Sequence, residues 1–438
     1  MSRSRESVCI IGAGPSGLTV CKALQEAGVP YECLEAGRSV GGIWDIEWGY
    51  GGGYRSLQTN TSTTKMAYSD FSFPETASQF PHHSEMLAYF NDYADHFGVR
   101  KTIELDCRVV SARPLEGGRW RVELAGGDTR EYAACIVATG QYGTKHWPDP
   151  APSGQFAGEI IHAADYLDPA TPVDCRDKRV VVVGLGSSAA EIATELAGGS
   201  DGEPVASRVT LSARSGRYIM PKIYKGKSLD ANAPHPSLEL PAAMRLLPEK
   251  VRLRLSRFAL EKVFARVAKE IGAPSDWNLP TPTFPAWGDR PTLSHGFIPA
   301  LESGRIHPMP GIAAYDGSTI KFTDGALEAT DVVIYATGYR LQFPFLDADM
   351  LGCEATDLSL YRRIAHPSRP GLYFIGFTKV LCSLWPLSEQ QAKWLAGVLR
   401  GDIALPKRAE QERRAVQVAK APPVFCNWDV LDLRSDQP

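Results

Sequence analysis

The sequence contains no long apolar run, no excess of positive charge and no closely paired cysteines. A membrane-spanning helix needs about 18 or more consecutive apolar residues, so the absence of such a run argues against one. The formal net charge of −3 at pH 7 argues against a nucleic-acid-binding protein, because such proteins usually present a basic surface. We therefore expect neither a membrane nor a nucleic-acid partner.

The nine cysteines are scattered singly along the chain, and none lies in a Cys-x-x-Cys pair. Such a pattern is typical of reduced cytoplasmic thiols and argues against a disulfide framework. The polar segment before the first apolar run is too short for a signal peptide, so we expect a cytoplasmic protein. His82 and His83 are adjacent, but no carboxylate or thiol completes a ligand set with them, and we predict no metal site.

Two glycine-rich loops are the most informative features of the chain. The first is Gly12-Ala13-Gly14-Pro15-Ser16-Gly17, and the second is Gly184-Leu185-Gly186-Ser187-Ser188-Ala189. Each follows a short apolar run and precedes a helical pattern, which is the context in which Gly-x-Gly-x-x-Gly/Ala indicates dinucleotide binding. Because 438 residues exceed one ordinary domain, we predict an α/β fold with two Rossmann-like dinucleotide-binding domains and a partly helical insert.

The first loop has the features of an FAD cradle. Its three glycines permit a tight turn, close approach to a pyrophosphate and close helix–strand packing, and the helix that starts at Pro15 directs its N–H groups at phosphate. Glu35 ends the next strand, where a carboxylate can accept ribose hydroxyls and would repel a 2′-phosphate. The glycines of Gly41-Gly42-Ile43-Trp44 would let the chain lie along a ligand as long as FAD.

The second loop favours NADPH over NADH. The strand that follows it carries no carboxylate at its end; Ser212, Arg214 and Arg217 stand there instead. A guanidinium in that place matches a 2′-phosphate in charge and geometry. Arg217 is equally well interpreted as a solvated surface charge.

A third motif lies between the two loops, Phe156-x-Gly158-x3-His162-x3-Tyr166. Taken in order with the two cradles, this motif resembles the fingerprint of class B flavoprotein monooxygenases, and the chain is similar to soluble bacterial-type flavin-containing monooxygenases almost from end to end. The other segments that carry the resemblance are Gly41–Trp44, Tyr54–Asn60, the Ala-Thr-Gly strand ends 138–140 and 336–338, and Glu389–Lys393.

The resemblance implies an enzyme that binds FAD and uses NADPH and O2. In that family NADPH reduces the flavin, oxygen adds at C4a to give a hydroperoxide, and one oxygen atom passes to a nucleophilic nitrogen or sulfur of a small molecule. Baeyer–Villiger ketone oxygenation, ornithine-type N-hydroxylation and an NADPH oxidase or sensor that releases H2O2 stay open as alternatives. Tyr166 stands where Baeyer–Villiger relatives typically carry Trp, which disfavours ketone oxygenation. The lack of a paired redox cysteine disfavours a disulfide reductase.

The resemblance also assigns residues. Asn60 is the expected catalytic residue, because an amide facing the flavin donates and accepts hydrogen bonds without titrating; an ordinary turn residue is the alternative. His162 is expected to serve domain linkage and NADPH use, or to be a plain interdomain histidine, and Gln390 is expected at a helix start near the isoalloxazine. The expected FAD-binding residues are Gly12, Gly14, Pro15, Ser16, Gly17, Glu35, Gly42, Ile43, Trp44, Thr59, Asn60, Thr139, Gly140 and Gln390. The expected NADP-binding residues are Gly184, Gly186, Ser187, Ser188, Ala189, Ser212, Arg214, Thr337 and Gly338.

We expect an FAD-binding domain formed by 1–168 and 331–438 and an NADPH-binding domain formed by 169–330. We also expect helices over 84–97, with Ser84 as N-cap, and over 388–399. The Pro-rich insert 226–300 carries apolar residues at helical spacing, which predict a helix packed on its own domain or, alternatively, a membrane-surface or dimer helix; a homodimer is left open. These residues are Leu260, Val263, Phe264, Val267 and Ile271.

Overall fold

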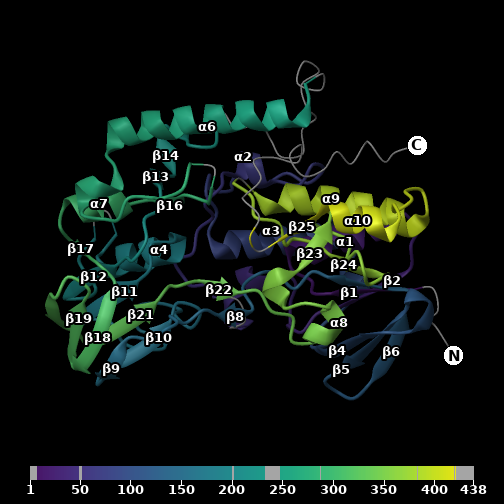
Figure 1. The fold of residues 1–438 in the computed structure, drawn as a ribbon, viewed down its shortest axis with the longest axis horizontal. Helices are drawn as coiled ribbons and strands as arrows, with labels where there is room; N and C mark the ends of the chain where they lie inside the picture. The colour runs from purple at the N-terminus through teal and green to yellow at the C-terminus, as the bar shows by residue number, and fades with distance from the viewer. Residues whose placement is uncertain are drawn as a thin grey trace.

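The computed structural model describes residues 7–48, 52–199, 202–231, 247–286, 288–381, 383–418 and 420. Two five-stranded parallel sheets form two lobes that lie side by side (Figure 1). The first sheet has the order β24 (Leu372–Phe374), β7 (Ala134–Val137), β1 (Val8–Ile11), β2 (Tyr31–Leu34) and β3 (Ile103–Glu104). The second has the order β10 (Glu159–His162), β21 (Val332–Tyr335), β11 (Arg179–Val183), β12 (Arg208–Ser212) and β17 (Ile306–Met309). This confirms the predicted α/β fold with two Rossmann-type units.

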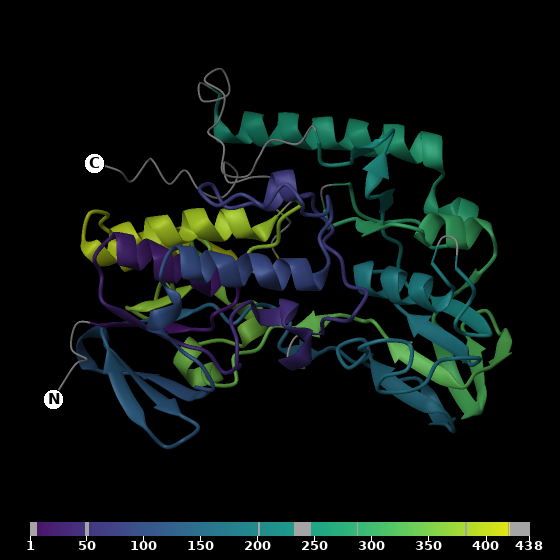
Figure 2. The ribbon, with the colours of Figure 1, turned by 180° about the vertical axis from the view of Figure 1, so that it is seen from behind.

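The first sheet is covered on both faces, as the continuous apolar run of its central strand requires. All four residues of β1 are buried. Three helices stack on one face (Figure 2), namely α1 (Pro15–Glu26), α3 (His83–His96) and α9 (Leu384–Arg400). The other face packs against a three-stranded antiparallel sheet of β4 (Val109–Pro114), β5 (Trp120–Leu124) and β6 (Thr129–Tyr132).

The second sheet repeats this plan with different covers. Its central strand β11 is apolar, and Val180, Val181 and Val182 are buried. One face carries α4 (Ser187–Leu196) and α7 (Phe297–Glu302). The other face packs against a sheet of β20 (Leu327–Ala329), β19 (Thr319–Phe322), β18 (Ile312–Gly317) and β9 (Ser153–Phe156).

The sheets correct the expected domain limits. Strands β10 and β21, which the limits 168 and 331 assign to the first domain, are hydrogen-bonded in the second sheet. The chain crosses between the lobes at β8 (Thr144–Lys145) and β22 (Tyr339–Arg340), which pair antiparallel. We therefore propose that the two domains divide at this ribbon; of the expected FAD-binding domain, 421–438 lies outside the described residues.

The insert packs on the second lobe and carries one long helix; the pairing of β13 with β16 extends it back from the expected limit of 226 to residue 219. Its strands are β13 (Ile219–Pro221) paired with β16 (Thr292–Ser294), and β14 (Ile223–Tyr224) paired with β15 (Lys227–Ser228). Helix α6 (Glu249–Ile271) runs along the outside of the molecule (Figure 1). Phe264 and Val267 are buried as expected for a packed helix, but Val263 is 47% exposed and does not belong to the packed face.

Two helix starts differ from the expected ones. Helix α3 begins at His83, one residue before Ser84, and the backbone N–H of His82 donates to the Glu85 side chain at 3.0 Å. Helix α9 begins at Leu384 rather than Ser388, with Ser383 as its N-cap. Pro386 lies in its first turn, where a missing N–H costs no intrahelical hydrogen bond.

The remaining described elements are short. No helix of the described residues is long and apolar enough to span a bilayer, and the seven cysteines in the described ranges are free thiols, six of them buried. The short elements are η1 (Gly42–Trp44), η2 (Ile46–Trp48), α2 (Thr63–Met66), η3 (Arg100–Thr102), η4 (Glu116–Gly118), η5 (Pro274–Trp277), α8 (Ala348–Leu351), η6 (Ala355–Asp357), β23 (Ser359–Tyr361), α10 (Arg408–Arg414) and β25 (Ala415–Gln417).

An ion pair ties the two central strands of the second sheet together. Asp331, just before β21, accepts from the Arg179 side chain at 2.7 and 3.0 Å and from the Arg179 backbone N–H at 2.8 Å. The Arg179 hydrogen bond lowers the pKa of Asp331 to about 2. Because the folded pKa lies below the unfolded value, the pair stabilises the fold above pH ~4, and this contribution is lost as the pH falls through about 2.

We therefore expect Asp331→Asn to lower the free energy of unfolding at pH 7 by about 1 kcal/mol, a value reduced for partial exposure. Urea unfolding at a series of pH values measures the effect, and the difference from wild type should shrink below pH 4. Asp316→Asn, on the exposed end of β18, is the matched control and should leave stability unchanged. A deficit that is the same at pH 4 and below would contradict the assignment to the ion pair.

Candidate active site

The first glycine loop is shaped by close contact with its own sheet. Gly12 has φ +103°, and a Cβ added there would lie 2.8 Å from the carbonyl oxygen of Ala138. A Cβ added at Gly17 would lie 1.9 Å from the carbonyl oxygen of Gly12. Gly12 is therefore required by the close approach of the loop to the end of β7, and Gly17 by the packing of α1 on β1. Gly14 faces Gly42, with 3.6 Å between an added Cβ and the Cα of Gly42.

The start of α1 is left open for an anion. Pro15 is its first residue and Gly14 its N-cap, and glycine has no side chain to accept hydrogen bonds from the first N–H groups. Such an N-terminus is suited to phosphate. The Ser16 hydroxyl lies 3.0 Å from that of Ser388 on α9, which joins the two helices at this point.

Glu35 lies at the edge of the same cradle, directly after β2. Its carboxylate accepts from the backbone N–H of Ala13 at 2.5 Å and from that of Gly37 at 2.7 Å. These bonds hold an acceptor beside the glycine loop, where the sequence places a ribose. They also tie the loop to β2, so Glu35 has a structural role whether or not a ligand is bound.

The second loop repeats the tight turn and leaves more room. Gly184 has φ +133°, and a Cβ added there would lie 2.5 Å from the carbonyl oxygen of Ala336. A Cβ added at Gly186 would meet no atom of the described residues within 4 Å. The open backbone at Gly186, followed by the start of α4 at Ser187, fits close approach of a pyrophosphate. The residues present therefore fit a dinucleotide at each loop.

The cluster expected to hold a 2′-phosphate is only partly available. Ser212 is buried and donates to the Pro310 carbonyl at 2.8 Å, so it is not placed as a phosphate ligand; burial of the end of β12 is the reason. Arg217 pairs with Asp289 at 3.1 Å. Arg214 is exposed and is the remaining candidate.

One irregular segment, residues 52–68, contacts the start of both cradle helices. A Cβ added at Gly53 would lie 2.6 Å from the carbonyl oxygen of Ile43 in the first lobe, and the Tyr68 hydroxyl donates to the Pro15 carbonyl at 2.9 Å. The Tyr54 hydroxyl donates to Glu191 on α4. We call residues 52–68 the bridging segment.

Asn60 lies on the bridging segment and is turned toward the second cradle. Oriented to satisfy its neighbours, its amide nitrogen donates to the Leu293 carbonyl at 3.1 Å and to Glu191 Oε1 at 3.2 Å, and its oxygen accepts from Ser187 Oγ at 3.3 Å. Ser187 is the first residue of α4. Its side chain therefore joins the bridging segment, α4 and the segment of Leu293, and its catalytic role stays a prediction.

His162 is fully buried where the lobes meet. Its Nδ1 accepts from the Ala164 N–H at 3.1 Å, and its ring packs edge-on against Trp147 and Tyr339, with centroids 5.3 and 5.6 Å apart. Burial lowers the pKa of His162, which favours the neutral ring. Tyr166 is buried and donates to Glu195 on α4 at 2.8 Å. The fingerprint thus packs the linking ribbon against the second lobe.

The other expected ligands fall into three groups. Thr139 and Gly140 are exposed at the end of β7. Thr337 and Gly338 lie at the crossing ribbon, where the Thr337 hydroxyl donates to the His146 carbonyl and the His146 N–H donates to Gly338 at 3.0 Å. Gln390 lies in the second turn of α9 and not at its start, because the helix begins six residues earlier; its neighbour Gln391 is buried and accepts from the Gly376 N–H at 3.2 Å.

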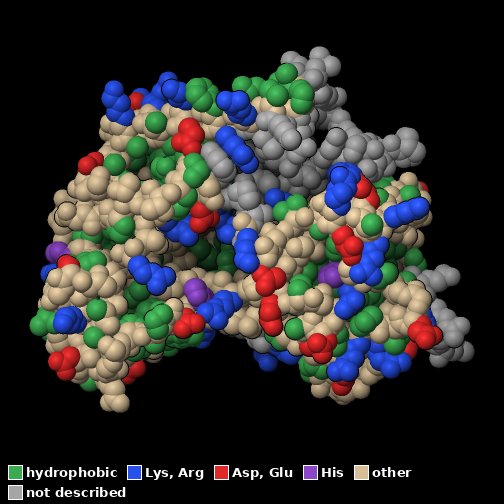
Figure 3. Space-filling model, in the orientation of Figure 1, with side chains coloured by type: hydrophobic (Ala, Val, Ile, Leu, Met, Phe, Trp, Pro, Cys, Tyr) green, Lys and Arg blue, Asp and Glu red, His purple; other side chains and the backbone are tan. Residues whose placement is uncertain are grey.

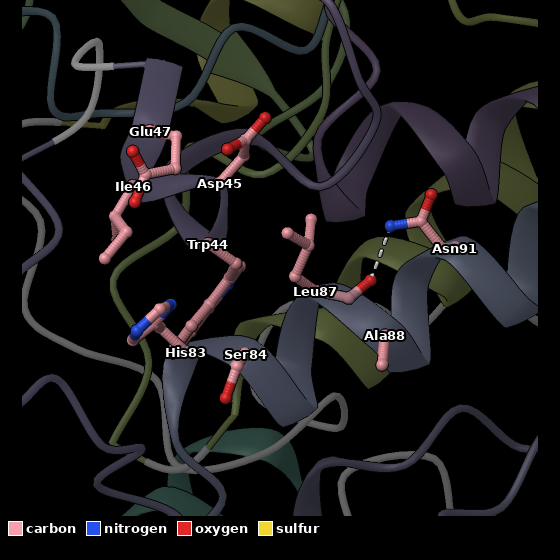
Figure 4. A pocket seen from close by; sticks show the side chains of 9 residues that line it. All are labelled: Trp44, Asp45, Ile46, Glu47, His83, Ser84, Leu87, Ala88 and Asn91. Carbon is pink, nitrogen blue, oxygen red and sulfur yellow. Dashed lines mark hydrogen bonds between the residues drawn. The ribbon is translucent and has the colours of Figure 1, made fainter. Parts of the chain in front are cut away.

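A pocket of about 340 Å³ opens beside the Gly41–Trp44 motif (Figure 4). Trp44 forms one wall and is buried edge-on against Trp385, with centroids 5.7 Å apart. Residues Asp45–Glu47 and the first three turns of α3 form the rest. In the space-filling view the surface is also hollowed between the two lobes (Figure 3), where the crossing ribbon joins them.

Sequence reasoning missed the charged residues around Asn60. Lys222 follows β13 of the insert, and its Nζ lies 3.3 Å from Glu191 Oε1. Burial raises the pKa of Glu191, and Lys222 opposes that rise. Glu191 could have been noticed in the sequence, because it lies on the helix that follows the second glycine loop. Its partner Lys222 could not, because the sequence pattern does not show how that segment packs.

A profile of the flavin-binding monooxygenase-like family matches residues 5–421. The chain belongs to this family. It is 30% identical over 427 residues to flavin-containing monooxygenase 5 of Cavia porcellus, covering 93% of this chain and 76% of that protein. It is also 30% identical to dimethylaniline monooxygenase [N-oxide-forming] 2 of Rattus norvegicus, with 92% and 74% covered. These matches confirm the expected family of flavoprotein monooxygenases.

Solved structures show the same fold. The complex of OTEMO with FAD and NADP superposes with a TM-score of 0.69 at 21% identity, over 95% of this chain and 92% of that one. The likeness confirms the two-lobed arrangement deduced from the two cradles.

The two cradle glycines Gly184 and Gly186 separate folding from ligand binding. An alanine at Gly186 meets open space, so we expect Gly186→Ala to keep its flavin and a melting temperature within about 2 °C of wild type. Its affinity for NADPH should fall at least about tenfold, the equivalent of about 1.4 kcal/mol, because the methyl group would occupy the approach to the pyrophosphate. Fluorescence titration with NADPH and thermal melting measure the two effects.

Gly184→Ala is the matched control in the same loop. Its positive φ and its contact with Ala336 predict a loss of stability instead. Unchanged NADPH affinity in a well-folded Gly186→Ala protein would show that the second loop does not hold the dinucleotide.

Proposed function

We propose that this protein is an NADPH- and O2-dependent monooxygenase that transfers one oxygen atom to a nucleophilic nitrogen or sulfur of a small molecule, with FAD in the first cradle and NADPH in the second. The observation that carries the proposal is the bridging segment, which contacts the start of both cradle helices. Two dinucleotides held there would meet beside Asn60. A cytoplasmic location and a homodimer stay predictions.

FAD held in the first cradle would supply the redox chemistry, namely acceptance of a hydride from NADPH and activation of O2 for transfer of one oxygen atom to the substrate, with the other leaving as water. The residues of this chain bind, orient and exclude water. The helix starts at Pro15 and Ser187 attract the two pyrophosphates. Asn60 supplies an amide that keeps the same charge across the working pH range.

Nitrogen or sulfur oxygenation is favoured over ketone oxygenation by two observations. The N-oxide-forming relative covers most of the chain. Tyr166 of the fingerprint is buried with its hydroxyl on Glu195, so the position that differs from Baeyer–Villiger relatives is part of the packed interface between fingerprint and second cradle helix.

Arg214 is proposed to select NADPH. Loss of a charge-assisted hydrogen bond to a phosphate costs about 1.5–3 kcal/mol, so Arg214→Ala should raise the KM for NADPH about tenfold or more and leave the KM for NADH nearly unchanged. Steady-state kinetics with both coenzymes measure this. Arg217→Ala, which removes a guanidinium already paired with Asp289, is the control and should have a smaller effect. Equal losses with NADPH and NADH would contradict the role of Arg214.

The reaction is tested by stoichiometry. Wild-type protein with a tertiary amine or a thioether should consume one NADPH and one O2 for each N-oxide or sulfoxide formed, while Asn60→Ala should keep its flavin but release most of the oxygen as H2O2. A peroxidase-coupled assay and mass spectrometry of the product measure both. Rapid mixing of reduced enzyme with O2 should give a long-lived absorbance, distinct from oxidised and reduced flavin, when NADP+ is present.

The alternatives have different signatures in the same assay. Stoichiometric H2O2 from the wild type with every nucleophile tried would indicate an oxidase, and ester formation from ketones would indicate Baeyer–Villiger chemistry. An unchanged product yield per NADPH in Asn60→Ala would contradict the proposed catalytic role of Asn60. Protein that stays colourless after reconstitution with FAD would overturn the proposal.

A further inference from the structure

A buried charged cluster joins the bridging segment, the second cradle helix and the insert. Its members are Tyr54, Glu191 and Lys222. Glu191 accepts from the Tyr54 hydroxyl through Oε2 and lies 3.3 Å from Lys222 Nζ through Oε1. The side chains of Glu191 and Lys222 are 12% and 3% exposed, so both charged groups are largely desolvated.

Packing alone does not account for this cluster. Burial raises the pKa of Glu191, and Lys222 and Tyr54 only oppose that rise. Replacing a buried ion pair with apolar residues of similar volume is often neutral or stabilising. A buried pair of this kind is best justified where it fixes the geometry of a neighbour, and the neighbour here is Asn60, whose amide nitrogen donates to the same Glu191 oxygen at 3.2 Å.

The chemistry of the acceptors determines which way the Asn60 amide points. A carboxylate and a backbone carbonyl can only accept, so Glu191 and Leu293 both require the NH2 group of Asn60. The amide oxygen must then face Ser187, which stands at the open start of α4. Without a charged acceptor at Glu191, only the Leu293 carbonyl would still require the NH2 group, and a 180° rotation of the amide would cost less.

We propose that Glu191, held in place by Lys222 and Tyr54, is a positioning residue that fixes the orientation of the Asn60 amide toward the second cradle. The inference rests on the proposed function, in which Asn60 lies where the two cofactors meet. It assigns to the insert, through Lys222, a role in orienting an active-site side chain. The insert holds the bridging segment at a second point too, because Asp230 accepts from Ser62 N and Oγ, both at 2.8 Å.

The test compares Glu191→Gln with Glu195→Gln in the holoenzyme. Glutamine keeps the shape of Glu191 but offers an NH2 group as well as an oxygen, so only Leu293 still requires the NH2 group of Asn60 and the rotated orientation becomes less costly. We expect Glu191→Gln to keep its flavin and a KM for NADPH within about threefold, but to raise H2O2 released per NADPH about fivefold or more, as loss of one charge-assisted bond allows. Glu195→Gln, one turn further along α4, removes a buried carboxylate that accepts from Tyr166 and should leave coupling unchanged.

A double variant separates this inference from the proposed function. In the Asn60→Ala background, Glu191→Gln should add no further H2O2, because residues that act through one another are not additive. Further uncoupling there would show that Glu191 acts elsewhere and overturn the inference, as would normal coupling in Glu191→Gln beside uncoupling in Asn60→Ala. Normal coupling in both single variants would instead remove Asn60 from the proposed function.

Folding is controlled by removing both charges together. If Glu191→Gln alone leaves Lys222 unpaired and does not fold, Glu191→Gln/Lys222→Met removes the isolated charge and is measured in its place. The same rise in H2O2 per NADPH is expected. A raised KM for NADPH with normal coupling would mean that the pair merely supports α4, and would overturn the inference.

Discussion

Close approach of backbone to backbone is the constraint on which both lobes depend. In the first lobe the carbonyl oxygen of Gly12 lies where a Cβ of Gly17 would be, and in the second the carbonyl oxygen of Ala336 lies where a Cβ of Gly184 would be. The first contact brings the start of α1 against the end of β1, and the second brings the loop after β11 against the end of β21. The neighbouring glycines Gly14 and Gly186 are the N-caps and leave the N–H groups at each helix start without a side-chain acceptor, so packing and phosphate binding are met by adjacent glycines of the same loop.

Two such cradles would not form one site without an element that contacts both of them. The bridging segment does this, with Tyr68 on the Pro15 carbonyl at one end and Asn60 on Ser187 at the other. The crossing ribbon of β8 and β22 is the second tie, and the buried His162 packs against its Tyr339. Lobes joined only by a ribbon would be free to move, and the contacts of the bridging segment restrict where the two helix starts can lie relative to each other.

Local patterns in the sequence predicted what depends on local chemistry. The strand–loop–helix units at Gly12 and Gly184 and the burial of Phe264 follow from spacing and periodicity alone. Three features did not follow. The pairing of β10 and β21 in the second sheet was not predicted, because parallel strands that are far apart in sequence carry no local signal of their pairing. Ser212 is turned inward because β12 ends against Pro310. The side chain of Asn60 contacts two segments besides its own, and one of them is an insert without a recognisable pattern.

The position of the insert explains why a long excursion can sit inside a nucleotide-binding lobe without disturbing it. Its two ends return to the same place, because β13 and β16 pair side by side and Thr292 donates to the Leu185 carbonyl within the second cradle loop. Lys222 directly follows β13, so the pairing that closes the insert also delivers the charge that neutralises Glu191. A lysine on a flexible surface loop would sample many conformations and would lose conformational entropy when it is buried. Lys222 is held in position by the neighbouring pair of strands β13 and β16. The sequence of the rest of the insert can therefore change while the orientation of Asn60 stays fixed.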